Sequence, residues 1–188
     1  GGMVSAAVAG DGRTVSVAMG TLSFASSRIP VAGPEREVLN ETVEIDGTPL
    51  TFSAATVGNP HCVVLRPRAD AAEARRWGPV IETDPRFPRR TNVQFLEVLG
   101  PKAIRIEIWE RGAGYTLSSG TSSCAAAAVA HRLGLCGPAV RVHMPGGALD
   151  VTIAPGFRVT LEGPVTRVAE GRLHREMLEQ SLPETAVS

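Results

Sequence analysis

The chain has 188 residues, a formal net charge of zero, 43% hydrophobic residues and 20% charged residues, a composition typical of a globular protein with a buried core. Its balanced charge, without a long Lys/Arg run, excludes the basic surface that nucleic acids or anionic lipids require. No apolar run approaches the roughly 20 residues of a membrane span, and the N-terminus lacks the pattern of a signal peptide. The sequence therefore predicts a cytoplasmic protein with neither a nucleic-acid nor a membrane partner.

Asp-Gly turns and alternating apolar residues predict hairpins in the first half of the chain. One such turn joins strands over 3–9 and 13–19, and another lies at Asp46-Gly47. A short helix is expected over 70–77, with Asp70 as its N-cap.

The second half of the chain is expected to contain further strands and two helices. Strands are predicted at 91–98, 103–109, 140–144, 149–153, 157–161 and 165–169. The alanine-rich helix over 120–133 is apolar nearly all round, which predicts that it is buried, and a surface helix is expected at 173–180. Many short strands around one buried helix favour an α+β fold, a curled antiparallel β-sheet wrapped around a central helix, over successive βαβ units.

Cysteine usage indicates neither disulfides nor a metal site. The three cysteines, Cys62, Cys124 and Cys136, are odd in number and form no Cys-x-x-Cys pair. We expect them to be reduced and buried as small hydrophobic side chains.

The stretch 109–130 is the part of the chain that suggests a ligand site, because it reads as a strand, a Gly/Ser-rich loop and a helix N-terminus. Ser118 and Ser119 are N-cap candidates, and the backbone N–H groups of residues 120–122 would be free in the first helical turn. Such a turn binds a carboxylate or a phosphate. An ordinary capped helix packed on a sheet is the alternative, and these residues alone do not choose between the two.

Five blocks of sequence resemble, in the same order, the second half of diaminopimelate epimerase, an amino-acid epimerase of lysine and peptidoglycan precursor synthesis. The blocks read GNPHCVV at 58–64, TNVQF at 91–95, ERGAGYT at 110–116, SGT followed by CA within 119–125, and PGG at 145–147. The resemblance implies two similar domains, each a curled antiparallel sheet around a central helix, with a small-molecule amino-acid substrate between them. It also implies an enzyme without a cofactor.

The resemblance assigns roles to individual side chains. Substrate binding falls to the residues that would hold the charged groups of an amino acid: Asn59, Asn92, Glu110, Arg111, Gly120 and Thr121. Catalysis falls to His61, Glu110 and Ser119, where Ser119 stands at the position of a catalytic cysteine. Because an alcohol is far less acidic than a thiol, Ser119 would need an activating base, and His61 is the candidate.

The serine at position 119 leaves three explanations open: an engineered change, a natural variant, or a related enzyme with different chemistry. The cysteine-bearing motif of the family's first domain does not occur in the chain. We therefore expect residues 1–24 to be the last hairpin of an otherwise missing first domain, residues 25–164 to be the second domain, and residues 165–188 to be a returning strand and tail.

The parent protein is expected to be the epimerase, whereas the isolated chain is expected to be inactive, with a homodimer as one expected form. The alternatives are a related racemase, a hydroxyproline dehydratase-like enzyme, or a binding domain without catalysis.

Overall fold

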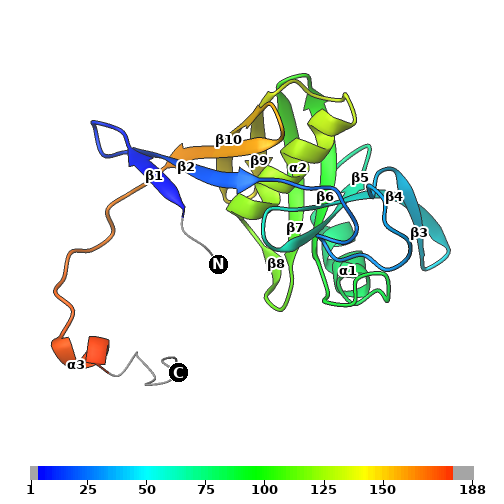
Figure 1. The fold of residues 1–188 in the computed structure, drawn as a ribbon, viewed down its shortest axis with the longest axis horizontal. Coiled ribbons are helices and arrows are strands. Elements are labelled where there is room, and N and C mark those ends of the chain that lie inside the picture. Colours follow the sequence, from blue (N-terminus) through cyan, green and yellow to red (C-terminus); the bar gives the residue numbers. More distant parts are fainter. Residues whose placement is uncertain (1–3, 180–188) are drawn as a thin grey trace.

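The computed structural model describes residues 4–179, which contain eleven strands and three helices (Figure 1). The strands are β1 (Ser5–Val8), β2 (Thr14–Thr21), β3 (Glu41–Ile45), β4 (Thr48–Thr56), β5 (Pro60–Leu65), β6 (Asn92–Gly100), β7 (Ala103–Glu110), β8 (Gly114–Thr116), β9 (Ala139–Met144), β10 (Gly147–Ala154) and β11 (Arg158–Pro164). The helices are α1 (Ala71–Glu82), α2 (Gly120–Arg132) and α3 (Arg175–Glu179). The predicted turn between β3 and β4 forms at Asp46 and Gly47, whose φ angles are 51° and 72°.

The described strands form one 11-stranded sheet in the order β1-β2-β11-β10-β9-β7-β6-β5-β4-β3, with β8 added to β7. Most neighbours are antiparallel, but β5 pairs with β6 and β7 pairs with β9 in parallel. Helix α1 lies in the connection between β5 and β6, and α2 lies in the connection between β7 and β9. Each long crossover returns the chain to the same end of the sheet, so the two strands that it joins run in parallel. The predicted α+β fold is confirmed, while the sheet is mixed instead of purely antiparallel.

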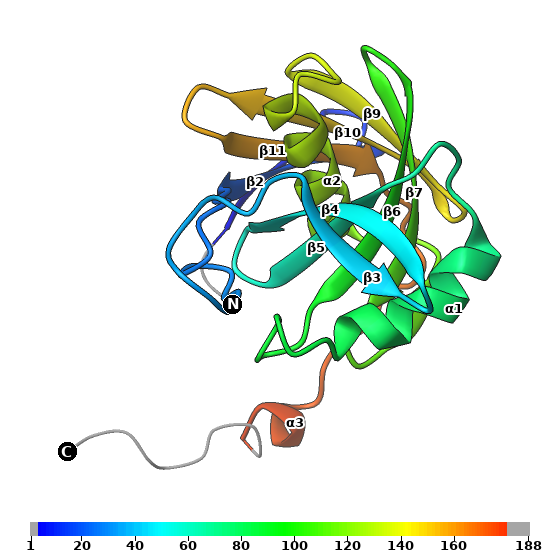
Figure 2. The same cartoon turned by 90° about the vertical axis from the view of Figure 1, so that its right-hand side faces the viewer.

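Helix α2 is the centre of the fold, and the strands curve around it (Figure 2). Its residues from Ser122 to Ala130 are all buried, as the apolar pattern predicts. The helix passes into the C-cap at Leu133, and Gly134 follows with a φ of 72°, a left-handed conformation that glycine adopts without strain. The surrounding core contains side chains from the strands that face the helix, among them Val63, Leu96, Ile104, Ile106, Ile108, Val142, Val151 and Val159.

Helix α1 covers a second core, built mainly from the alternate residues of β4, β5 and β6. Asp70 caps this helix as predicted, with its Oδ1 accepting hydrogen bonds from the backbone N–H groups of Ala72 and Glu73. The helix is longer than the predicted 70–77 because it continues through Gly78 and Pro79. A Cβ at position 78 would lie 2.5 Å from Cγ of Trp109, so close packing against β7 requires glycine there.

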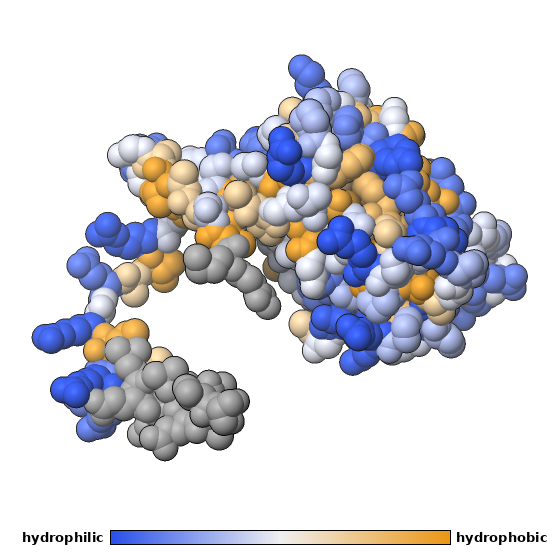
Figure 3. Space-filling view, in the orientation of Figure 1, coloured by the Kyte–Doolittle hydropathy of each residue, from blue (hydrophilic) through white to orange (hydrophobic). Residues whose placement is uncertain are grey.

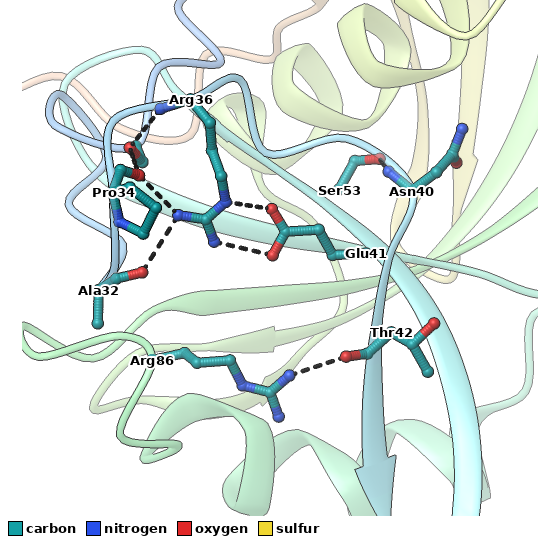
Figure 4. A network of polar contacts seen from close by, with 9 residues as sticks. Ala32, Pro34, Arg36, Asn40, Glu41, Thr42, Ser53 and Arg86 are labelled. Carbon is teal, nitrogen blue, oxygen red and sulfur yellow. Dashed lines mark hydrogen bonds and ion pairs between the residues drawn. The ribbon is translucent and has the colours of Figure 1, made fainter.

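Polar contacts tie the connector between β2 and β3 to the sheet (Figure 4). The guanidinium of Arg36 donates two hydrogen bonds to the carboxylate of Glu41, at 2.6 and 2.9 Å. The hydroxyl of Ser53 accepts a hydrogen bond from the backbone N–H of Asn40 at 3.0 Å. These contacts fix the path by which the chain passes from the N-terminal hairpin into the body of the molecule.

The β1–β2 hairpin and the C-terminal segment project from this body (Figure 1). Strand β11 joins the hairpin to the sheet by pairing with β2. The predicted strand over 165–169 is wrong, because residues 165–174 have no regular secondary structure. Only the N–H of Val165 continues the ladder, to the carbonyl of Arg13 at 2.8 Å, and a strand without a partner is not stable.

The predicted C-terminal helix corresponds to α3, whereas residues 180–188 lie outside the described part of the chain. No helix within residues 4–179 is long and apolar enough to cross a membrane.

Candidate active site

The N-terminus of α2 is capped by Ser119, not by Ser118. The backbone of Ser119 is extended, and its Oγ accepts a hydrogen bond from the N–H of Ser122 at 3.4 Å. The expectation that the amide of Ser122 is free is therefore wrong. The N–H groups of Gly120 and Thr121 have no hydrogen-bond acceptor among the described residues. No residue of the first turn is itself acidic, so the two free amides and the positive end of the helix dipole can bind an anion.

The turn between β7 and β8 carries Glu110 and Arg111, and two buried side chains hold its backbone. Oδ1 of Asn92 accepts a hydrogen bond from the N–H of Arg111 at 2.9 Å, and Oε1 of Glu82 accepts one from the N–H of Gly112 at 2.9 Å. The amide nitrogen of Asn92 donates to the first carbonyl of β5 at 2.9 Å. The structure thus gives Asn92 the task of joining β5 to this turn, and its contact with a substrate stays a prediction.

Glu82, the last residue of α1, is part of the site that sequence analysis missed. Its side chain is only 5% exposed and forms an ion pair with Arg90 at 2.6 Å. Its Oε2 accepts a hydrogen bond from Nε1 of Trp109 at 2.7 Å. This role could not be predicted from the sequence, because the predicted helix ends at Trp77, before the Gly-Pro pair.

A row of side-chain hydrogen bonds leads from the sheet through α2 to Glu110. Nε2 of Gln94 donates to Oγ of Ser122 at 3.0 Å, and this hydroxyl donates to Oε1 of Glu110 at 3.0 Å. Gln94 and Ser122 are fully buried and were not assigned a role from the sequence. The available signal was a polar residue between two apolar residues of the strand, Val93 and Phe95.

Three predicted site residues form a second polar group at the same end of α2. Nδ2 of Asn59 lies 3.5 Å from Oγ1 of Thr121, and its Oδ1 lies 3.1 Å from Nε2 of His61. Complete burial lowers the pKa of His61 to about 3 and outweighs a hydrogen bond with Gln94, which raises the pKa, while the charge of Arg111 lowers it further; the imidazole is therefore neutral at pH 7. No hydrogen bond between His61 and Ser119 is present among the described residues, and the activation of Ser119 by His61 stays a prediction.

The remaining predicted residue, Arg111, is exposed, and its guanidinium donates to the carbonyl of Arg89 at 2.9 Å. Arg111 follows Glu110, whose carboxylate lies 3.0 Å from the hydroxyl of Ser122 in the first turn of α2. Donors and acceptors of this kind suit a ligand with both a carboxylate and an ammonium group.

The cysteines do not contribute a thiolate to this site. All three are free and buried, as the sequence predicts. Burial raises the pKa of Cys124 to about 12 and raises that of Cys62 as well, so both stay protonated at neutral pH. Within residues 4–179, no three His, Cys, Asp or Glu side chains are grouped to hold a metal ion.

Comparison with known proteins relates the chain to a group of epimerases. The family model described as diaminopimelate epimerase matches residues 53–168. The chain is 51% identical to diaminopimelate epimerase 2 of Nostoc sp. over 94% of its own length and 62% of the relative's, and 42% identical to the diaminopimelate epimerase of Pelotomaculum thermopropionicum over 85% and 57%. It therefore spans about three fifths of the length of these relatives.

The fold is similar to that of a hydroxyproline epimerase from Agrobacterium vitis, crystallised with bound trans-4-hydroxy-L-proline. The TM-score is 0.64 at 18% identity, and the match covers 87% of this chain and 54% of the other. At this identity the likeness concerns the fold alone.

Proposed function

The chain belongs to the diaminopimelate epimerase family, and from this membership we propose that the protein is an amino-acid epimerase that works without pyridoxal phosphate. We propose diaminopimelate as its substrate, interconverted between the LL and meso forms for lysine and peptidoglycan precursor synthesis. The names of the relatives from Nostoc and Pelotomaculum support this choice. Because the chain covers only part of those relatives, the activity is proposed for the complete protein.

The observation that carries the proposal is the set of free donors and fixed acceptors at the N-terminus of α2. The α-carboxylate of the substrate would bind to the N–H groups of Gly120 and Thr121, which have no acceptor among the described residues. The carboxylate of Glu110 would accept hydrogen bonds from the substrate ammonium, and the guanidinium of Arg111 would bind a carboxylate through two parallel hydrogen bonds.

Epimerisation removes the α-proton from one face of the carbon and returns a proton to the opposite face. Ser119 lies beside the proposed carboxylate site and would serve one face, with the helix dipole favouring negative charge on its oxygen. Burial keeps His61 neutral and makes its imidazole a weak base, so its proposed role is to tune the acid/base pair and not to hold the α-proton itself. The group for the other face would come from the part of the relatives' length that this chain does not cover.

A second candidate function is amino-acid binding without catalysis. Oγ of Ser119 is already used as the helix cap, and no base contacts it among the described residues. The same site would also suit a related racemase, which differs in the substrate side chain, or a hydroxyproline dehydratase-like enzyme, which differs in the reaction.

The test is α-proton exchange in deuterated water, followed by proton NMR for the complete protein with diaminopimelate, proline and 4-hydroxyproline. We expect the α-proton signal of diaminopimelate to disappear, and Ser119→Ala to abolish the exchange. Exchange with proline alone would reassign the protein to a related racemase, and loss of hydroxyl from hydroxyproline would indicate a dehydratase. Binding of the three amino acids without any exchange would show that the protein binds amino acids but does not catalyse epimerisation.

This function implies a free amino acid as the partner and the cytoplasm as the location. Three buried cysteines, none of them in a disulfide, support a reducing compartment. We also propose a homodimer as one form of the isolated 188-residue chain, for which the exposed apolar residues of the projecting hairpin provide a surface.

A further inference from the structure

We propose that Ser122 is a positioning residue that fixes the carboxylate of Glu110, and that Gln94 sets the direction of the Ser122 hydroxyl hydrogen. The effect on catalysis rests on the proposed function. The contact itself does not, because it involves only side chains of this chain.

The direction of the hydrogen bonds follows from chemistry. Nε2 of Gln94 carries two hydrogens and can only donate, so Oγ of Ser122 is the acceptor at 3.0 Å. The hydroxyl hydrogen must then point to the other neighbour, Oε1 of Glu110, which also lies at 3.0 Å. Both Gln94 and Ser122 are fully buried, where a hydrogen bond to a carboxylate is stronger than in water.

Fixing this carboxylate matters because Glu110 stands at the end of β7, before a turn with glycines at 112 and 114. The φ angles of these glycines are 77° and 82°, so the backbone that follows Glu110 is shaped by the turn and not by a strand. With Oε1 held by Ser122, Oε2 has no hydrogen bond among the described residues and remains available for an ammonium group.

Ser122 also connects the two candidate catalytic groups. Its backbone N–H donates to Oγ of Ser119 at 3.4 Å, while its own hydroxyl donates to Glu110. One residue therefore sets the distance between the group proposed to exchange the proton and the group proposed to hold the ammonium. Removing its hydroxyl should loosen Glu110 and leave the cap of α2 in place.

The contact is tested in the 188-residue chain by carbon-13 NMR of the Glu110 side-chain carboxyl. We expect both Ser122→Ala and Gln94→Met to shift this signal, the second change keeping the length of the side chain. Ser53→Ala is the matched control, because Ser53 is also buried and accepts one hydrogen bond, from Asn40, away from the site. A Glu110 signal that stays in place in both site variants would overturn the proposal, whether or not the protein is an enzyme.

The consequence is tested in the complete protein by the kinetics of α-proton exchange. Ser122→Ala should lower kcat/KM by about tenfold or more, the size expected for a hydrogen bond to a charged group, while Ser53→Ala should leave it nearly unchanged. The loss in the Ser122→Ala/Gln94→Met double variant should be smaller than the two single losses combined, because both residues act on Glu110 through one hydroxyl. Additive losses would contradict the shared route, whereas a wild-type protein without exchange would overturn the proposed function and leave the NMR result to decide the positioning role.

Discussion

At the scale of single residues, the hydroxyl of Ser119 caps α2, and the same hydroxyl is proposed to exchange the substrate proton. Ser119→Ala is expected to lower the free energy of unfolding by about 1 kcal/mol through loss of the cap. Ser118→Ala is the matched control, since Ser118 is the exposed neighbour that does not cap the helix. Urea unfolding of both variants measures this change. A larger loss of unfolding free energy in Ser118→Ala than in Ser119→Ala would show that Ser119 is not the cap.

The buried, neutral state of His61 should make the stability of the chain depend on pH. Its folded pKa, about 3, is below the ordinary value of 6.5, so the unfolded chain binds more protons between these pH values. The stability from a neutral buried imidazole is complete above pH 6.5 and is lost as the pH falls toward 3, with a slope of up to about 1.4 kcal/mol per pH unit.

Unfolding measured between pH 7.5 and 5 should show this slope, before most carboxylates titrate. His61→Gln should flatten it, whereas His174→Gln, at an exposed position, should not. A wild-type stability that is constant over this range, or that rises as the pH falls, would contradict the neutral buried state of His61.

At the scale of elements, the C-terminal end of α1 supports the turn between β7 and β8 through Glu82. Glu82→Gln should destabilise the chain by about 1–3 kcal/mol, because a buried carboxylate loses its charge and one acceptor. Asp150→Asn removes an exposed ion pair with Arg141 and should cost less than about 1 kcal/mol.

Hydrogen exchange distinguishes a local effect of Glu82 from a general loss of stability. We expect the backbone amide of Gly112 and the indole N–H of Trp109 to exchange faster in Glu82→Gln, while amides of β4 keep their protection. Equal changes throughout the chain would argue against a specific support of this turn.

The sequence was sufficient for elements whose signals are local. The turn at Asp46-Gly47, the cap at Asp70 and the buried alanine-rich helix follow from neighbouring residues, and all three are present. The parallel pairs β5/β6 and β7/β9 could not be predicted in this way, because their partners are joined by long crossovers. Glu82 was missed for a related reason: packing of Gly78 on Trp109 carries α1 past a local stop signal.

At the scale of the whole molecule, the projecting β1–β2 hairpin and the segment after β11 expose apolar side chains (Figure 3). Val8 is 64% exposed and Val168 is 93% exposed. We propose that the described parts of these two segments, residues 4–24 and 165–179, pack against a first domain supplied by the part of the relatives' length that this chain does not cover.

The exposed hairpin predicts that the 188-residue chain self-associates. Sedimentation velocity at increasing concentration should show dimers or larger species, and Val8→Asp should reduce them. Val80→Asp is a control on α1, where an exposed valine lies outside the hairpin. A chain that stays monomeric at all concentrations would contradict this surface as an interface.

The central claim is that an amino acid binds through its carboxylate to the N-terminus of α2. Titration of the nitrogen-15-labelled chain with meso-diaminopimelate measures this directly, with 1,5-diaminopentane as a control that has both amino groups and no carboxylate. We expect the amide signals of Gly120 and Thr121 to shift with diaminopimelate and not with the diamine. Unmoved signals at these two amides, or equal shifts with both compounds, would contradict it.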